Sequence, residues 1–162
     1  MARVYISIGS NIDRDENIRS GMCSLEKKYG KLTLSSVYDS ESVGFDGDDF
    51  YNLVAGFDTD DDLFELAETL RGIEDHHHRD RSGQRFSSRT LDIDLLLYDN
   101  LIVNERGVRI PRDEITSSAF VLGPLAEIDG SLLHPELKKT VLSLWQAFDK
   151  STQPMQRIEF DW

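Results

Sequence analysis

Two aspartates, Asp92 and Asp94, stand in the otherwise apolar segment 91–98. If this segment is a strand, its side chains alternate between the two faces of a sheet. One face would carry Leu91, Ile93, Leu95 and Leu97, and the other would carry Asp92, Asp94, Leu96 and Tyr98. Burying two unpaired carboxylates is costly, so the aspartate face must meet water, a cation or basic side chains. Such a pair can hold Mg²⁺, which takes one or two protein carboxylates and completes its shell with water and phosphate oxygens. For an Asp-x-Asp pair alone, an exposed strand face is the other interpretation.

The segment directly before this pair, residues 79–89, is basic. It contains Arg79, Arg81, Arg85 and Arg89, in a chain whose formal net charge is -12. Arginines bind phosphate oxygens in bidentate fashion, and a metal ion bridges neighbouring phosphates. A basic segment beside paired carboxylates therefore predicts phosphoryl transfer involving a nucleotide. The glycine and serine content predicts a mobile loop that closes over the substrates as a lid.

Composition excludes several other classes of function. The sequence pI of about 4.6 argues against general binding to nucleic acids or anionic membranes, since both need a positive surface. Cys23 is the one cysteine, so an internal disulfide is not possible and a reducing compartment is expected. We find neither a signal-peptide pattern nor an apolar run near the roughly 20 residues that span a bilayer. We therefore expect a cytoplasmic, monomeric protein with one domain over residues 1–162.

Hydrophobic spacing predicts the order strand, helix, strand, strand, helix, strand. The strands are expected at residues 4–8, 32–38, 50–57 and 91–98. The first helix carries an apolar stripe and ends at Gly30, and the second begins with Thr59 as its N-cap. The stripe of the first helix consists of Ile18, Met22, Leu25 and Tyr29. This order fits a ferredoxin-like α+β sandwich, an antiparallel sheet with helices packed on it.

The remaining segments are less regular. Short hairpin strands are expected near residues 101–103 and 108–111, an apolar helix near 120–125 and a final helix near 142–148. Residues 39–49 are expected to form a long polar loop. His76, His77 and His78 are adjacent, but neighbouring helical positions diverge by about 100° and cannot all reach one ion, so we expect a solvated surface there.

Four motifs together resemble a known family. Residues 89–96 have the sequence RTLDIDLL, and the other motifs are ISIGSN at 6–11, FYN at 50–52 and AFVLGPL at 119–125. In this order they are similar to the signature segments of the 6-hydroxymethyl-7,8-dihydropterin pyrophosphokinases of folate biosynthesis. The resemblance implies transfer of pyrophosphate from ATP to 6-hydroxymethyl-7,8-dihydropterin, with AMP as the other product.

The resemblance also implies a role for each matching residue. Arg79 and Arg89 would be catalytic, and Asp92 and Asp94 would hold two Mg²⁺ ions. ATP, the co-substrate, would be bound by Glu74, Arg81, Arg85 and Arg112. The reduced pterin would be bound by Phe50, Asn52, Phe86 and Phe120, with its ring stacked between the two last-named phenylalanines. A strand cap is the other interpretation of Asn52.

The chain differs from the usual family pattern at five positions. Phe86 replaces a tryptophan, Ser87 and Ser88 replace Gly-Pro, Arg112 replaces a histidine, and Ser118 replaces a basic residue. Two alternatives to an active enzyme therefore stay open. One is a pterin- or nucleotide-binding paralogue with little or no turnover. The other is an RNA-binding ferredoxin-like domain that uses the arginines of 79–89, which the net charge disfavours.

Overall fold

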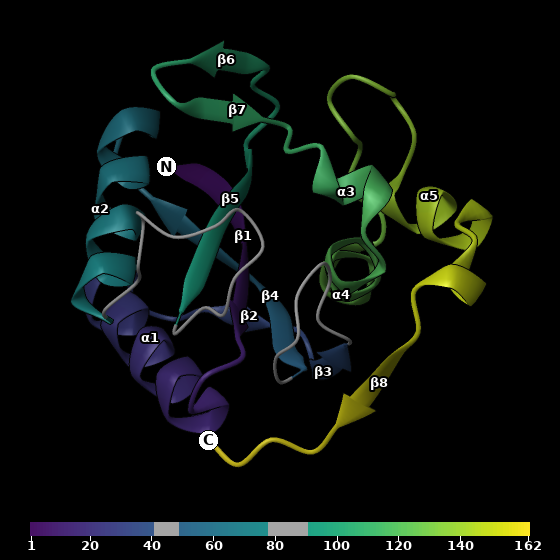
Figure 1. The fold of residues 1–162 in the computed structure, drawn as a ribbon. Helices are drawn as coiled ribbons and strands as arrows, with labels where there is room; N and C mark the ends of the chain where they lie inside the picture. Colours follow the sequence, from purple (N-terminus) through teal and green to yellow (C-terminus); the bar gives the residue numbers. More distant parts are fainter. Residues whose placement is uncertain (41–48, 78–90) are drawn as a thin grey trace.

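The computed structural model describes residues 1–40, 49–77 and 91–162 as an antiparallel sheet with helices on both faces (Figure 1). The strands are β1 (Ala2–Ser10), β2 (Thr33–Leu34), β3 (Val37–Ser40), β4 (Phe50–Thr59), β5 (Asp92–Tyr98), β6 (Val103–Glu105), β7 (Val108–Ile110) and β8 (Met155–Ile158). The helices are α1 (Arg14–Tyr29), α2 (Leu63–His76), α3 (Glu114–Ser117), α4 (Ala119–Asp129) and α5 (Val141–Ala147), with a short 3-10 turn at Lys150–Thr152. Among the described helices, none is long and apolar enough to cross a membrane.

The main sheet has the strand order β5-β1-β4-β3-β8, with β2 paired to β4. Each pairing in it is antiparallel. The order strand, helix, strand, strand, helix, strand along the chain, with β1 between β5 and β4, confirms the predicted ferredoxin-like α+β sandwich. A separate hairpin, β6-β7, stands above α2 and β5 in Figure 1.

Helices α1 and α2 cover one face of the sheet. The predicted stripe of α1 is confirmed, because Ile18, Met22 and Leu25 are buried and Tyr29 packs against them. Gly30 ends this helix with φ 81° and donates its N–H to the Glu26 carbonyl at 2.8 Å. Together with the inward residues of β1, β4 and β5, these helices form the larger hydrophobic core.

Helix α4 covers the opposite face and builds a second, smaller core. Its buried residues Val121, Leu122 and Leu125 pack against Tyr5 of β1 and Val54 of β4. This face also carries Asp92 and Asp94, because Ile93 and Leu95 between and beside them belong to the larger core. The two carboxylates therefore border the second core on the same face of the sheet.

The expected alternation along β5 holds as far as Leu96 and then fails. The register with β1 shifts between Tyr5 and Ile6, which pair with Leu97 and Leu95. This irregularity turns Leu97 to the face of Leu96, where both are buried against α4, and Tyr98 packs with the larger core. The prediction for Leu97 and Tyr98 was therefore wrong, whereas the shared face of Asp92 and Asp94 is confirmed.

Two other expectations are corrected, and one strand was not predicted. Thr59 ends β4, and Asp62 is the N-cap of α2, accepting from the N–H groups of Phe64 and Glu65 at 3.0 and 2.9 Å. The strand expected at 32–38 is two pieces, β2 and β3. The tail, which has no strand pattern in the sequence, adds β8 to the edge of the sheet beside β3.

Candidate functional site

Asp92 and Asp94 lie side by side on the α4 face of β5, and both are half-buried. Their partners in the sheet are small, because Gly9 pairs with Asp92 and Ser7 pairs with Asp94. Small neighbours leave the two carboxylates uncovered on the sheet side. The predicted pair is therefore placed as a cation site would need it.

Glu74 of α2 fixes the backbone between the two aspartates. Its Oε2 accepts the Ile93 N–H at 2.8 Å, and the side chain is buried. Strand β5 is the edge of the sheet, so this N–H points to α2 and away from the strand ladder. The resemblance to the family implied that Glu74 lies near the nucleotide. In the structure it is a residue of α2 that hydrogen-bonds to the strand carrying Asp92 and Asp94.

Arg112 reaches the same edge from the segment after β7. Its N–H donates to the Leu96 carbonyl at 3.1 Å. Its Nη2 lies 3.4 Å from Asp94 Oδ1 and its Nε lies 2.9 Å from Glu114 Oε2, although Nε is not aligned for a hydrogen bond. Arg112 thus contacts Asp94 and Glu114 at once, while Asp113 pairs with Arg109.

The site carries more negative charge than its arginine balances. Burial, and then the charge of Asp92, raise the pKa of Asp94 to about 7, while Arg112 acts in the opposite direction. Glu74 and Glu114 add to the increase. A divalent cation would relieve this repulsion. Within the described ranges, His, Cys, Asp and Glu form no cluster of three or more that could hold a metal. Two carboxylates on one face match the one or two that Mg²⁺ takes from a protein.

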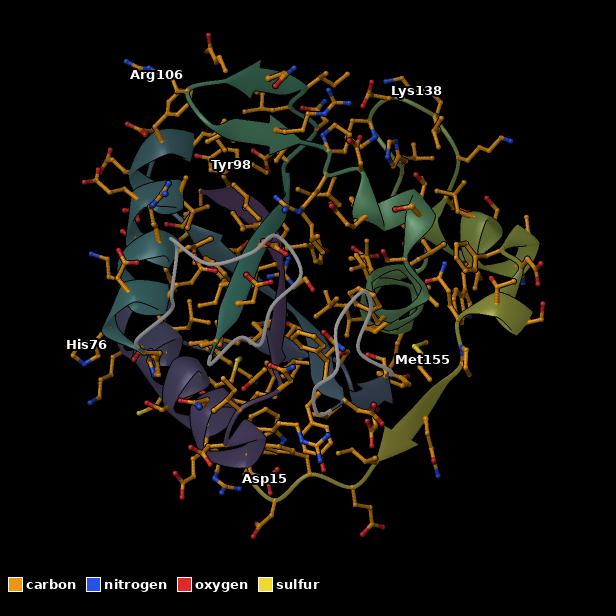
Figure 2. The ribbon with its side chains drawn as sticks, in the orientation of Figure 1. Asp15, His76, Tyr98, Arg106, Lys138 and Met155 are labelled. Carbon is orange, nitrogen blue, oxygen red and sulfur yellow. The ribbon has the colours of Figure 1, made fainter. Side chains whose placement is uncertain are left out.

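A cavity of about 480 Å³ opens beside Asp94, between α2, β5 and the β6-β7 hairpin. Its apolar wall consists of Phe64, Ala67, Leu70, Ile93, Leu95 and Val108. Its polar wall consists of Glu68, Arg71, Glu74, Asp94, Arg106, Gly107, Arg109 and Arg112. Figure 2 shows Arg106 at the turn of the hairpin, and its guanidinium lies 4.6 Å above the Phe64 ring. The size suits a small organic ligand, and the arginines suit an anionic one.

On the far side of Gly9 lies Asn52. Gly9 pairs with Asp92 on one side and with Asn52 of β4 on the other, so the two side chains share a face and are two strands apart, roughly 10 Å. Asn52 is buried and donates from Nδ2 to Ser40 Oγ at 2.7 Å. It is the third residue of β4, so the strand-cap interpretation is wrong.

Comparison with known proteins identifies the family. Residues 5–130 match the family described as 7,8-dihydro-6-hydroxymethylpterin-pyrophosphokinase (HPPK). The chain belongs to this family. It is 33% identical over 139 residues to the 2-amino-4-hydroxy-6-hydroxymethyldihydropteridine pyrophosphokinase of Haemophilus influenzae, covering 83% of this chain and 86% of that protein. The enzyme of the same name from Bacillus subtilis is 34% identical over 129 residues, or 76% of each chain. The pyrophosphokinase predicted from the four motifs is confirmed.

Solved structures agree on the fold. An HPPK-DHPS crystallised in complex with substrates has a TM-score of 0.75 and 12% identity, covering 93% of this chain and 44% of that one. Wild-type HPPK-DHPS of Plasmodium falciparum with STZ-DHP has a TM-score of 0.70 and 14% identity, covering 90% of this chain and 41% of that one. The chain thus spans less than half the length of these crystallised proteins. At these identities the likeness shows the fold.

In this member of the pyrophosphokinase family, two further residues predicted for the pterin lie on the carboxylate face. Phe50 precedes Asn52 by two positions on β4 and is half-buried. Phe120 is at the start of α4, half-buried, and packs against the cluster that contains Val54. Asn52, Phe50 and Phe120 are therefore brought to one side of the sheet.

Several predicted residues lie outside the described residues. These are Arg79, Arg81, Arg85, Phe86, Ser87, Ser88 and Arg89, together with His78. Among the other differences from the family pattern, Ser118 precedes α4 without a side-chain capping bond. The described part of the site consists of Glu74, Asp92, Asp94, Arg112 and the residues on the Asn52 side.

The expectation of a solvated histidine surface is half wrong. His76 is exposed at the end of α2 (Figure 2), but His77 is buried. The two ring nitrogens of His77 lie 2.7 Å from the Ile73 carbonyl and 2.8 Å from Ser20 Oγ of α1. His77 therefore joins the two helices.

Three arginines of the cavity wall were not predicted from the sequence: Arg71, Arg106 and Arg109. Arg106 and Arg109 flank the Gly107 turn of the hairpin, and Arg71 is on the outer surface of α2. Basic residues on either side of a predicted tight turn were the available signal. Only the packing of the hairpin over α2 brings them together with Arg112.

Proposed function

We propose that this chain transfers pyrophosphate from ATP to 6-hydroxymethyl-7,8-dihydropterin, giving AMP and the pterin diphosphate. The observation that carries the proposal is the row of Asp92, Gly9 and Asn52 across three neighbouring strands. On one face this row holds a carboxylate that would serve the phosphates and an amide that would bind the heterocycle, with a glycine between them. Family membership supplies the reaction class.

The cavity is the site that we propose for ATP. Its apolar wall would take the base, and Arg71, Arg109 and Arg112 would bind anionic oxygens. Asp94 lines the cavity, and Asp92 is the next residue on the same face in the direction of Asn52. A triphosphate leaving the cavity would therefore pass over the carboxylates on its way to the pterin.

We propose that Asp92 and Asp94 hold two Mg²⁺ ions. When bound, Mg²⁺ supplies neutralisation of the triphosphate and of the charge that develops in the transition state. Glu74 keeps the two carboxylates in position through the Ile93 N–H. The protein's own contribution would be orientation of the reactants and exclusion of water.

On the acceptor side, Asn52 would hydrogen-bond the edge of the pterin ring, since an amide offers both donors and an acceptor. Phe120 and Phe86 would stack on the ring, and Phe50 would border it. The pterin hydroxymethyl oxygen would then attack the β-phosphorus in line. A new O–P bond forms, the bond between the β-phosphorus and the α,β-bridging oxygen breaks, and AMP leaves with that oxygen. The hydroxyl proton would pass to solvent.

The remaining assignments extend this proposal. Arg79 and Arg89 would be catalytic and Arg81 and Arg85 would bind phosphate, by resemblance to the family. Glu74 would border the nucleotide. The enzyme would act as a cytoplasmic monomer of one domain, residues 1–162, without a nucleic-acid or membrane partner. A pterin- or nucleotide-binding paralogue with little turnover is the alternative.

Product analysis separates the two. The protein is incubated with ATP, Mg²⁺ and 6-hydroxymethyl-7,8-dihydropterin, and AMP, ADP and the pterin products are resolved by chromatography. We expect AMP and pterin diphosphate in equal amounts and none without the pterin. Binding of both ligands without AMP would show the paralogue, and ADP with a pterin monophosphate would show a different transfer reaction.

A further inference from the structure

We propose that Arg112 is an internal counter-ion of Asp94. When a cation arrives with the nucleotide, it takes the place of Arg112 at Asp94, and Arg112 binds a phosphate group of the nucleotide instead. The inference rests on the proposed function in two respects, namely that Asp92 and Asp94 bind the cation and that the cavity beside them binds the nucleotide. It adds a coupling between cation and nucleotide that is built from this chain's own residues. This coupling depends on Arg112, the residue that replaces the usual histidine of the family.

The first observation is competition for one carboxylate. Arg112 Nη2 lies 3.4 Å from Asp94 Oδ1, and the two side chains keep 35% and 31% of their exposure. At this distance and burial the guanidinium neutralises part of the charge that a cation would use. A divalent ion on the same oxygen would be repelled by Arg112, so the two positive groups exclude one another.

The second observation is that Arg112 is poorly satisfied where it is. Its Nε is buried and, in the part of the chain that the structure describes, has no aligned acceptor, although Glu114 Oε2 is 2.9 Å away. A buried donor without an aligned acceptor is unfavourable. Arginine has five N–H donors arranged for bidentate binding, and a phosphate group could satisfy more of them than the present contacts do.

The third observation is where the guanidinium can go. Arg112 lines the cavity, and its backbone is fixed at both ends, by its N–H to the Leu96 carbonyl and by its carbonyl to the Ile115 N–H, each at 3.1 Å. The side chain can therefore change partner while the backbone stays in place. Glu114 remains beside it throughout as a second carboxylate.

Two linked effects follow. Without nucleotide, the cation must displace Arg112 from Asp94, so it binds weakly. With nucleotide bound, Arg112 gains a phosphate partner, so the cation and the nucleotide each raise the binding affinity of the other. Thermodynamic linkage requires the factor to be the same in both directions.

The test measures Mn²⁺ affinity by electron paramagnetic resonance without nucleotide, in the wild type and in Arg112→Gln. We expect the variant to bind Mn²⁺ about fivefold more tightly, near the upper limit for a partly exposed ion pair. The matched control is Arg109→Gln, which removes the same charge from the same cavity wall but from a residue paired with Asp113 at 3.1 Å. An equal gain in both variants would show a general field effect and would overturn the proposal.

A double-mutant cycle with Asp94→Asn locates the effect. We expect Arg112→Gln to change Mn²⁺ affinity little when Asp94 is already neutral. An undiminished gain in that background would overturn the pairing. If Asp94→Asn itself leaves Mn²⁺ affinity unchanged, the metal assignment of the proposed function fails instead, so the two failures are distinguishable.

The coupling is tested with α,β-methylene-ATP, which cannot be cleaved at the reacting position. We expect it to tighten Mn²⁺ binding in the wild type and to do so several-fold less in Arg112→Gln. Arg112→Lys, which keeps the charge without the forked donors, should fall between them. Equal coupling in the wild type and Arg112→Gln would overturn the transfer of Arg112 to a phosphate.

Discussion

Asn52 and Asp92 lie on opposite sides of Gly9, as its register partners on the two neighbouring strands. An amide on β4 and a carboxylate on β5 are thereby held on one sheet face, with no side chain between them. A side chain at position 9 would enter this space. Adding a single methyl group at Gly9 is therefore expected to affect pterin binding.

Gly9→Ala should weaken pterin binding by about tenfold, the equivalent of one lost hydrogen bond. A Cβ at Gly9 would lie 2.7 Å from Asn52 Oδ1, so the amide must move. The free energy of unfolding should fall by about 1–3 kcal/mol from overpacking. Fluorescence titration with the pterin and thermal unfolding measure the two effects. Gly72→Ala is the control, since nothing lies within 4 Å of its Cβ in α2, and it should raise stability by up to about 1 kcal/mol.

Asp94→Asn should lower turnover by roughly a hundredfold or more, yet stabilise the protein in the absence of metal. The folded pKa of Asp94 is raised to about 7, above the unfolded value near 4. The folded state therefore binds more protons between these values, and stability from this group is lost as pH rises through the window. The advantage of the variant in urea unfolding with EDTA should grow from pH 4 to pH 7. A variant less stable than the wild type at pH 7 would contradict the repulsion described for this site.

Glu74→Ala should lower the free energy of unfolding by about 1–3 kcal/mol, because the Ile93 N–H loses its acceptor at the edge of β5. Turnover should fall as well, since the strand between the two aspartates is released. Glu74→Gln retains a side-chain oxygen and should keep most of the stability. Glu68→Ala, on the exposed surface of the same helix, is the control in urea unfolding. Equal stability of the Ala and Gln variants at position 74 would rule out this role of the hydrogen bond.

His134 should make the protein less stable in mild acid. Its Nδ1 accepts the N–H groups of Glu136 and Leu137 at 3.2 and 3.1 Å, so the ring must be neutral at that nitrogen. Burial lowers the pKa of His134, with Glu136 acting in the opposite direction. Its contribution to stability is therefore present above the unfolded pKa, near 6.5, and is lost as pH falls below it. His134→Gln should flatten the pH dependence of unfolding below pH 6.5, and His76→Gln at the exposed end of α2 should not.

Local patterns predicted the parts of the fold that depend on local rules. Period-2 and period-3.6 spacing gave the strands and helices of the ferredoxin-like core, and placed Asp92 and Asp94 on one face. The faces of Leu97 and Tyr98 were missed because a register shift with β1 is a property of two strands and not of one. Strand β8 is only four residues long, too short for a clear pattern in the sequence, and it pairs with β3.

The candidate site likewise has a part that could be predicted from the sequence and a part that depends on tertiary packing. Strand alternation singled out the two carboxylates, and resemblance to the family singled out Asn52 and Phe120. The pairing of Arg112 with Asp94 and the approach of Arg106 and Arg109 to α2 depend on how the hairpin packs. Spacing along the chain carries no information on that packing.

The most direct measurement of the central claim, that cation and pterin bind on one face across Gly9, uses Mn²⁺ as a paramagnetic probe. Bound at Asp92 and Asp94, it would be roughly 10 Å from Asn52. We expect Mn²⁺ to broaden the Asn52 side-chain amide signal and the signals of the bound pterin, and the double variant Asp92→Asn with Asp94→Asn to abolish the broadening. Sharp Asn52 and pterin signals at saturating Mn²⁺ in the wild type would contradict the account.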